Sequence, residues 1–205
     1  MLEEAAAMGL TLSPPAVGKL NILMQLLGKW NRVYNLTALR DEKTWVSHHL
    51  LDSLSVVPIL PAGRLIDVGS GAGFPGLPIA VADPDRHIVL VDSSQKKTAF
   101  LRHAVAEMGL DNVSVETIRV EAYGPELAFQ VVVSRAFSSL LEFVRVAGHL
   151  CADDGRLVAM KGIFPEEELR QLTAACVDKV VPLDVPSLDA QRHAVFINPA
   201  LLVGS

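Results

Sequence analysis

Residues 64–76 read Arg-Leu-Ile-Asp-Val-Gly-Ser-Gly-Ala-Gly-Phe-Pro-Gly. The run starts apolar and ends with four glycines within eight residues, which predicts a buried strand followed by a tight turn and a helix. Gly69, Gly71 and Gly73 lack the side chains that would keep a ligand away from the main chain. The helix, expected to start near Pro75, would point its free amide groups at the same place. The stretch therefore predicts a turn that binds a ligand through its backbone.

The same glycines fit two classes of cofactor. Gly71, Gly73 and Gly76 satisfy the dinucleotide pattern of glycine, any, glycine, any, any, glycine, which alone is weak evidence. Asp67 favours a cofactor with a cationic group over a dinucleotide. An acid at the carboxyl end of a strand attracts a cation but repels a pyrophosphate. S-adenosylmethionine (AdoMet) offers an ammonium group there and no phosphate. The alternative for Asp67 is a carboxylate that caps the helix or forms the turn.

A second acid ends the next apolar run. Asp92 directly follows residues 88–91. An acid about 20 residues beyond the glycine turn in the sequence commonly binds ribose hydroxyls. Both cofactor classes use that contact. The alternative for Asp92 is a helix cap beside Ser93 and Ser94.

The composition limits the classes of protein that fit. A chain of 205 residues, 50% hydrophobic, is long enough for one domain with a buried core and a small appendage. The net charge of −5 does not favour a nucleic-acid binder, so such a role needs a local basic face. The start of the chain lacks a secretory signal, and no apolar run reaches the roughly 18 residues of a membrane span, so we expect a cytoplasmic protein. Cys151, Cys176 and the histidines lack metal-ligand spacing, and we expect no metal.

The first part of the chain predicts a helical cap, residues 1–61, packed on a core domain, residues 62–205. An amphipathic helix is expected to start at Pro14, with Ser13 as its cap. Its apolar side chains recur every three and four residues. A second helical pattern starts at about residue 41 and ends at Pro58.

The segment between these two helices, residues 30–40, mixes aromatic and basic side chains. This mixture suits single-stranded RNA through stacking and phosphate contacts. It is also common at helix ends, so the residues alone favour packing with solvated arginines.

Strands and helices alternate beyond the glycine turn. The expected strands are 88–91, 113–118, 129–133 and 157–160, and the expected helices are 94–108 and 139–150. This alternation predicts an α/β fold with a mainly parallel sheet and helices on both faces. The last part of the chain departs from this alternation. We expect a helix at 166–176 and then two strands, 180–185 and 194–198, with only a loop between the two strands. The two strands predict an antiparallel pair at the sheet edge, as in class I AdoMet-dependent methyltransferases with their Rossmann-like, seven-stranded sheet and reversed last strand.

Ligands in open parallel sheets bind at the carboxyl ends of the strands. The residues that follow the expected strands include Phe74, Val120, Glu121, Arg135 and Lys161. Phe74 is suited to pack against the cofactor, and Val120 and Glu121 are suited to contact the edge of its adenine. Arg135 is expected near the methyl acceptor. Spacing alone allows a solvated carboxylate at Glu121 and a surface ion pair at Arg135 equally well.

Several blocks of the sequence are more specific than the fold. They are Trp30-Asn31, Tyr34-Asn35-Leu36-Thr37, residues 49–54 (His-Leu-Leu-Asp-Ser-Leu), residues 67–76, Ser134-Arg135-Ala136-Phe137, Lys161-Gly162 and Arg192-His193. Together they resemble the glucose-inhibited division protein B family, the bacterial ribosomal RNA small-subunit methyltransferase G enzymes. The resemblance covers nearly the entire chain. It implies AdoMet-dependent methylation of guanine N7 at one position in the decoding-region loop of 16S ribosomal RNA.

The resemblance also implies cofactor contacts at Gly69, Phe74, Val120, Glu121 and Arg135. With the residues chosen from the pattern, the expected cofactor-binding set is Asp67, Gly69, Gly71, Gly73, Phe74, Asp92, Val120, Glu121 and Arg135. Guanine N7 carries a lone pair and no proton, so no general base is expected. Arg135 and Lys161 are then candidates for positioning residues.

The expected partner is 16S ribosomal RNA or a small-subunit assembly intermediate, bound by a monomer. The candidate RNA contacts are Lys29, Arg32, Asn35, Arg40, His49, Lys96, Lys161 and Arg192. Each basic residue is alternatively a solvated charge. Two other functions remain as alternatives, an NAD-dependent oxidoreductase that uses the same glycines and a non-catalytic RNA-binding factor with a vestigial pocket.

Overall fold

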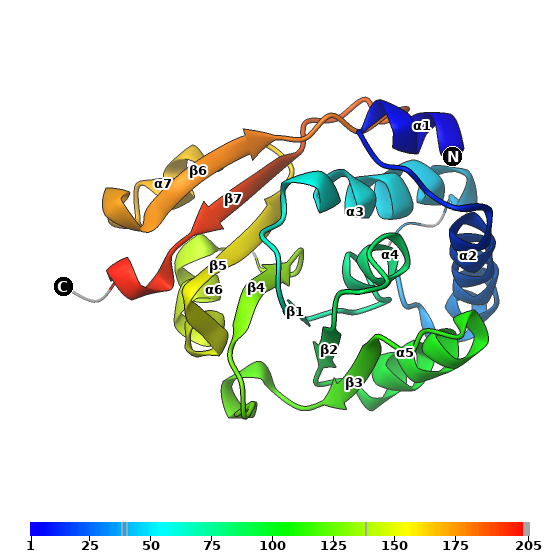
Figure 1. The fold of residues 1–205 in the computed structure, drawn as a ribbon, viewed down its shortest axis with the longest axis horizontal. Helices are drawn as coiled ribbons and strands as arrows, with labels where there is room; N and C mark the ends of the chain where they lie inside the picture. Colours follow the sequence, from blue (N-terminus) through cyan, green and yellow to red (C-terminus); the bar gives the residue numbers. More distant parts are fainter. Residues whose placement is uncertain (38, 40, 138, 203–205) are drawn as a thin grey trace.

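The computed structural model describes residues 1–37, 39, 41–137 and 139–202. Its centre is a seven-stranded sheet in the order β3-β2-β1-β4-β5-β7-β6 (Figure 1). The strands are β1 Leu65–Val68, β2 Ile88–Asp92, β3 Val113–Thr117, β4 Phe129–Ser134, β5 Cys151–Lys161, β6 Val177–Pro182 and β7 His193–Ile197. Strands β1 to β5 pair in parallel, whereas β7 runs antiparallel to β5 and β6. The predicted α/β fold with a reversed strand near one edge is confirmed.

Helices cover both faces of this sheet (Figure 1). They are α1 Leu2–Ala7, α2 Pro14–Tyr34, α3 Asp52–Ser55, α4 Gly76–Ala82, α5 Gln95–Met108, α6 Leu140–Ala147 and α7 Glu166–Leu169, with short 3-10 turns at η4 Val120–Ala122, η5 Gly148–Leu150 and η7 Pro199–Leu202. Successive strand residues point to opposite faces, so Leu65 packs in the apolar cluster with α2, α4 and α5, and Ile66 packs in the cluster with α6. Because both faces are covered, β1 and β2 are buried along their whole length.

The predicted amino-terminal cap shares its core with the sheet. The Ser13 hydroxyl accepts a hydrogen bond of 3.3 Å from the Ala16 amide, and Pro14 starts α2 as expected. Apolar side chains of α2 lie in the same buried cluster as those of α4 and α5. The division of the chain at residue 61 stays a prediction.

The second helical pattern is confirmed as a helical stretch, but the type of helix changes along it. It consists of the 3-10 turn η1 Glu42–Thr44, the π-helical turn η2 Val46–Leu51, α3, and the 3-10 turn η3 Val57–Ile59. A π-helical turn inserts an extra residue into the helical repeat and is common at functional sites. Here His49, on that turn, and Asp52, at the start of α3, are both buried polar residues.

The helix expected over residues 166–176 is wrong beyond its first turn. Helix α7 stops at Leu169, and a separate 3-10 turn, η6 Ala174–Cys176, follows. The break lets Leu172 and Cys176 enter the apolar cluster that includes α6. Burial of these side chains outweighs the local helical preference.

Candidate active site

The turn after β1 requires glycine at three positions. Gly69, Gly71 and Gly73 have φ angles of +71°, +57° and +89°, in the left-handed region that other residues rarely adopt. A Cβ on Gly69 would lie 2.9 Å from the Cβ of Ala136, and a Cβ on Gly73 would collide with the side chain of Leu77. A Cβ on Gly71 would meet no atom closer than 3.8 Å. Packing therefore restricts Gly69 and Gly73, whereas only the backbone conformation restricts Gly71.

Asp67 lies in β1, two residues before this turn. Its carboxylate is fully buried, and Oδ2 accepts a hydrogen bond of 2.9 Å from the Gly76 amide at the start of α4. Oδ1 has no partner in the described part of the chain. Burial raises the pKa of Asp67 to about 7, against the opposing effects of the Gly76 bond and Arg135. The bond to Gly76 favours the alternative, a carboxylate that holds the first amide of α4, and the contact of Asp67 with a cofactor cation stays a prediction.

Asp92 fastens the turn to the end of β2. Its Oδ2 accepts a hydrogen bond of 3.0 Å from the Gly71 amide, and its Oδ1 accepts one of 2.9 Å from the Ser94 amide. Nζ of Lys97 lies 3.4 Å from Oδ2. The bond to Ser94 is a turn of the chain just before α5, and the alternative of a helix cap is wrong, because Ser94 is itself the N-cap residue and no side-chain hydrogen bond caps α5. Asp92 also lines a cavity, and its ribose contact stays a prediction.

A hollow of about 230 Å³, here called the strand-end cavity, lies at the carboxyl ends of β1 to β4. Its lining consists of Val68, Gly69, Val91, Asp92, Ser93, Lys97, Ile118, Arg119, Val120, Glu121, Ala136 and Phe137. Four predicted cofactor-binding residues therefore meet here: Gly69, Asp92, Val120 and Glu121. The other predicted cofactor residues, Asp67, Gly71, Gly73, Phe74 and Arg135, do not belong to this lining.

A second hollow, of about 380 Å³, lies between the amino-terminal cap and the ends of β4 and β5. This basic pocket is lined by Thr37, Leu39, His48, His49, Asp52, Arg135, Met160, Lys161, Gly162 and Arg192. Arg135 lines the basic pocket, and its neighbours Ala136 and Phe137 line the strand-end cavity. One short segment after β4 thus contributes to both hollows.

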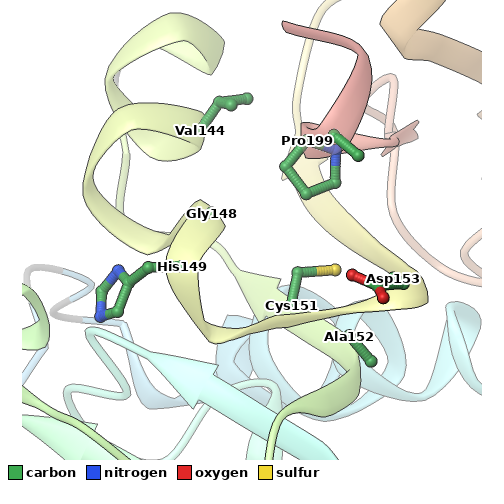
Figure 2. Close-up of a pocket in the computed structure, with 8 residues that line it drawn as sticks. Val144, Gly148, His149, Cys151, Ala152, Asp153 and Pro199 are labelled. Atoms are coloured by element: carbon green, nitrogen blue, oxygen red, sulfur yellow. The ribbon is translucent and has the colours of Figure 1, made fainter. Parts of the chain in front are cut away.

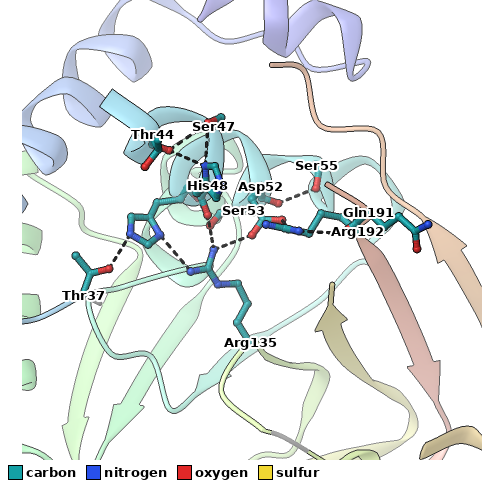
Figure 3. Close-up of polar contacts among 11 residues, drawn as sticks. Thr37, Thr44, Ser47, His48, Asp52, Ser53, Ser55, Arg135, Gln191 and Arg192 are labelled. Atoms are coloured by element: carbon teal, nitrogen blue, oxygen red, sulfur yellow. Dashed lines mark hydrogen bonds and ion pairs between the residues drawn. The ribbon is translucent and has the colours of Figure 1, made fainter. Parts of the chain in front are cut away.

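Asp52 joins two arginines of the basic pocket (Figure 3). Its Oδ2 lies 2.9 Å from Nη1 of Arg135, and its Oδ1 lies 3.1 Å from Nε of Arg192. The carboxyl group is 5% exposed; burial raises the pKa of Asp52, while both guanidinium groups oppose that shift. Sequence reasoning did not select Asp52. The available signal was its place in the block 49–54, three residues after His49.

His49 connects the basic pocket to the glycine turn. Its Nδ1 lies 3.3 Å from Nη2 of Arg135, and its Nε2 lies 3.0 Å from Oγ1 of Thr37. Since guanidinium nitrogens only donate, Nδ1 accepts and Nε2 carries the hydrogen. Burial and the charge of Arg135 lower the pKa of His49 to about 4, so the ring is neutral near pH 7. The ring also stacks on Phe74 of the turn, with centroids 4.7 Å apart and planes 14° apart.

Lys161, at the end of β5, is held by two acceptors. Its Nζ donates to the carbonyl oxygen of Phe137 at 2.9 Å and to Oε2 of Glu168 at 2.8 Å. Glu168 Oε2 also accepts a hydrogen bond of 2.8 Å from the Leu140 amide, at the start of α6. The ammonium group therefore has a fixed place in the wall of the pocket.

A family model described as rRNA small subunit methyltransferase G matches residues 16–195. The chain belongs to this family. The ribosomal RNA small subunit methyltransferase G of Chromobacterium violaceum is 55% identical over 192 residues, which cover 93% of this chain and 92% of the relative. The protein of the same name from Neisseria meningitidis serogroup B is 51% identical over 195 residues, which cover 94% of each. The resemblance found in the sequence blocks is confirmed.

Solved structures share the fold of this methyltransferase G family member. A predicted O-methyltransferase from Agrobacterium tumefaciens aligns with a TM-score of 0.56 and 21% identity, covering 73% of this chain and 79% of that one. A SAM-dependent methyltransferase from Thiobacillus denitrificans, in complex with S-adenosyl-L-homocysteine, aligns with a TM-score of 0.53 and 16% identity, covering 75% of this chain and 74% of that one. At these identities the likeness establishes the class I methyltransferase fold alone.

The residues predicted to contact RNA in this family member lie in separate places. His49, Lys161 and Arg192 line the basic pocket. Lys29 and Arg32, on α2, line another hollow of about 490 Å³ beside η2. Their contacts with RNA stay predictions.

The remaining predicted RNA contacts lie near the end of α2 or beyond the described residues. Lys96, on α5, donates a hydrogen bond of 2.9 Å to the carbonyl oxygen of Tyr34, and Asn35 ends α2 in the left-handed conformation. Arg40 lies outside the described residues. Asn35 and Lys96 therefore have structural roles whether or not they meet RNA.

A further hollow of about 380 Å³ lies at the start of β5, far from the carboxyl ends of the parallel strands (Figure 2). Burial raises the pKa of Cys151 in its wall to about 11, which leaves the thiol protonated and a poor nucleophile. His149 points away from Cys151 in Figure 2, and its Nε2 lies 3.1 Å from the carbonyl oxygen of Tyr123. This family member has, among its described residues, no group of three side chains suited to hold a metal ion. None of the helices in the described ranges is long and apolar enough to cross a membrane.

Proposed function

We propose that the protein transfers the methyl group of AdoMet to N7 of one guanine in the decoding-region loop of 16S ribosomal RNA. The observation that carries this proposal is the pair of hollows that share the segment after β4. Ala136 and Phe137 line the strand-end cavity, and Arg135 lines the basic pocket. A methyl donor in the first hollow and an acceptor in the second would meet beside that segment.

The strand-end cavity suits the nucleoside part of AdoMet. Asp92 and Glu121 bring carboxylates to the ends of β2 and β3, where acids accept hydrogen bonds from hydroxyl and amino groups. A carboxylate has about four lone-pair sites, so Asp92 retains acceptor capacity beside its bonds to the protein. Gly69 offers bare backbone to the same space. When bound, AdoMet supplies a methyl group on a positively charged sulfur.

The basic pocket suits the guanine. Guanine N7 needs no general base, because its lone pair is free at neutral pH. His49 agrees with this chemistry, since its ring is neutral and both ring nitrogens already have partners. Arg135 and Lys161 serve as positioning residues. Alignment of the two reactants is then the main source of rate and is worth up to about 7–11 kcal/mol.

The proposed partner is small-subunit ribosomal RNA, free or in an assembly intermediate, and the protein acts as a monomer in the cytoplasm. Double-helical RNA hides the major-groove edge of guanine, so an exposed loop guanine is the expected substrate. The net charge of −5 opposes RNA binding. The cations gathered at the basic pocket, Arg135, Lys161 and Arg192, offset that charge locally.

Incubation with methyl-labelled AdoMet and 16S ribosomal RNA, followed by nucleoside analysis, tests this function. We expect the label in 7-methylguanosine at one position. Label in protein or in small molecules only would contradict the proposal. Calorimetric binding of NAD without binding of AdoMet would favour the oxidoreductase, and RNA binding indifferent to AdoMet would favour the non-catalytic factor.

A further inference from the structure

The loop after β5 exposes two adjacent apolar side chains directly after two residues that line the basic pocket. Ile163 is 81% exposed and Phe164 is 47% exposed. The two residues before them, Lys161 and Gly162, line the basic pocket. Exposure of two neighbouring large apolar side chains forgoes the gain from their burial, and such exposure commonly marks an interaction site.

This loop stands on a fixed base. The ion pair of 2.8 Å between Lys161 and Glu168 closes it. Nδ1 of His193 donates a hydrogen bond of 2.8 Å to the carbonyl oxygen of Gly162. The ring of Phe164 meets the ring of His193 edge to face, with centroids 5.6 Å apart and planes 81° apart. These contacts hold the base of the loop and the ring of Phe164 in place, which lowers the entropic cost of binding a ligand there.

The charges around the loop select the kind of ligand. Arg135, Lys161 and Arg192 are cations of the adjoining pocket. Asp52 neutralises part of the charge of the two arginines, and Glu168 pairs with Lys161. A polyanion with apolar faces complements this combination, and unpaired RNA is such a polyanion, because its bases stack on side chains while its phosphates pair with cations.

We propose that Ile163 and Phe164 pack against the nucleotide next to the target guanine and take its place in the base stack when that guanine enters the basic pocket. This inference rests on the proposed function. A base that enters an enclosed pocket must leave its neighbours, which costs free energy. Apolar side chains that fill the vacated stack recover part of that cost, as wedge residues do in DNA.

The test compares two fragments of 16S ribosomal RNA that contain the decoding-region loop. One is unmodified, and the other has abasic sites on both sides of the target guanine, so that no stack holds the base. The Ile163→Ala/Phe164→Ala variant should methylate the unmodified fragment at least about tenfold more slowly than wild type in single turnovers, since stacking one base on a side chain contributes that much. On the abasic fragment, we expect the two proteins to differ by less than about threefold.

Leu127→Ala is the matched control. Leu127 is also an exposed apolar residue, at 65%, but its carbonyl oxygen accepts a hydrogen bond from Arg64, before β1, at the opposite end of the sheet. Its substitution should leave both rates unchanged. An equal loss on both fragments in the double variant, or no loss on either, would overturn the role of Ile163 and Phe164. If the wild type methylates neither fragment, the comparison is repeated with small-subunit assembly intermediates reconstituted from the two RNAs. Failure of the wild type on these as well would refute the proposed function, and the role of Ile163 and Phe164 with it.

Discussion

Asp52 and Arg135 lie 83 positions apart in the chain, and their side chains form an ion pair of 2.9 Å. The pair joins α3 of the amino-terminal cap to the segment after β4. The second oxygen of Asp52 binds Arg192, just before β7. One buried carboxylate therefore links three parts of the chain around the basic pocket and orients two of its guanidinium groups.

Asp52→Asn should weaken both folding and methyl transfer. The substitution leaves two close guanidinium groups without their counter-charge, and we expect a loss of about 1–3 kcal/mol in the free energy of unfolding. Urea unfolding measures this loss. Asp85→Asn is the control, because Asp85 is an exposed carboxylate outside both hollows. Equal stability of the two variants would show that the Asp52 bridge contributes nothing.

Arg135→Lys should reduce methyl transfer by about 10- to 100-fold while the protein stays folded. Lysine keeps the charge but cannot reproduce the fork that reaches Asp52, His49 and the His48 carbonyl together. Single-turnover rates at saturating AdoMet measure the effect, and thermal unfolding checks the fold. An unchanged rate would remove Arg135 from the site.

Gly69→Ala should weaken AdoMet binding at least about tenfold, because the new Cβ would crowd Ala136 and shift the turn that borders the strand-end cavity. Calorimetric titration with AdoMet measures the affinity. Gly109→Ala is the matched control, since Gly109 also has a positive φ, of +57°, but a Cβ there would meet nothing within 4 Å. The control should lose stability from strain and keep its AdoMet affinity; similar affinity losses in both variants would rule out crowding as the cause.

Two buried groups should give stability opposite dependences on pH. The folded-state pKa of Asp67, about 7, lies above its ordinary value of 3.8, so its contribution is fully present below pH 3.8 and is lost as pH rises to about 7. The folded-state pKa of His49, about 4, lies below its ordinary value of 6.5, so its contribution is present above pH 6.5 and is lost as pH falls to about 4. Between these limits the two changes oppose each other in the wild type.

A variant that lacks one of the two groups should therefore show the pH dependence of the free energy of unfolding that the other group causes. In Asp67→Asn, the free energy of unfolding should rise more steeply with pH between 4.5 and 6.5 than in wild type, by at most about 1.4 kcal/mol per pH unit. In His49→Gln, it should fall relative to wild type over the same interval. Urea unfolding at several pH values tests both; parallel curves for all three proteins would mean that neither pKa is shifted.

Lys29→Glu with Arg32→Glu should weaken binding to 16S ribosomal RNA and leave AdoMet affinity unchanged. Each lost phosphate contact should also make the logarithm of affinity less dependent on the logarithm of salt concentration, by about 0.7–0.9 per contact. Filter binding at several salt concentrations measures both quantities. An unaltered salt dependence would place α2 outside the RNA interface.

The sequence correctly predicted that the residues following the parallel strands meet at one edge of the sheet, around the strand-end cavity. Apolar runs mark parallel strands, and the residues after those strands must meet at one edge of the sheet, which is where Gly69, Asp92 and Glu121 lie. Asp67 lies near the carboxyl end of β1 as predicted, but its complete burial could not be read from the sequence. Side chains alternate along β1, so Asp67 shares the face of Leu65, beneath α4.

The basic pocket was less accessible to sequence reasoning. Its central residue, Asp52, meets Arg135 and Arg192 across 83 and 140 positions, and no local periodicity reports such contacts. The π-helical turn before Asp52 was equally hidden, since the apolar spacing from residue 45 onward resembles that of an ordinary helix.

The stacked rings of His49 and Phe74 have a consequence for how this enzyme can change. Phe74 belongs to the glycine turn beside the strand-end cavity, which we propose for the methyl donor, and His49 belongs to the wall of the basic pocket, which we propose for the acceptor. A mutation at either ring displaces its companion, so affinity for donor and acceptor cannot drift separately at this point. Adaptation to a different RNA target would have to proceed through side chains that leave this stack intact.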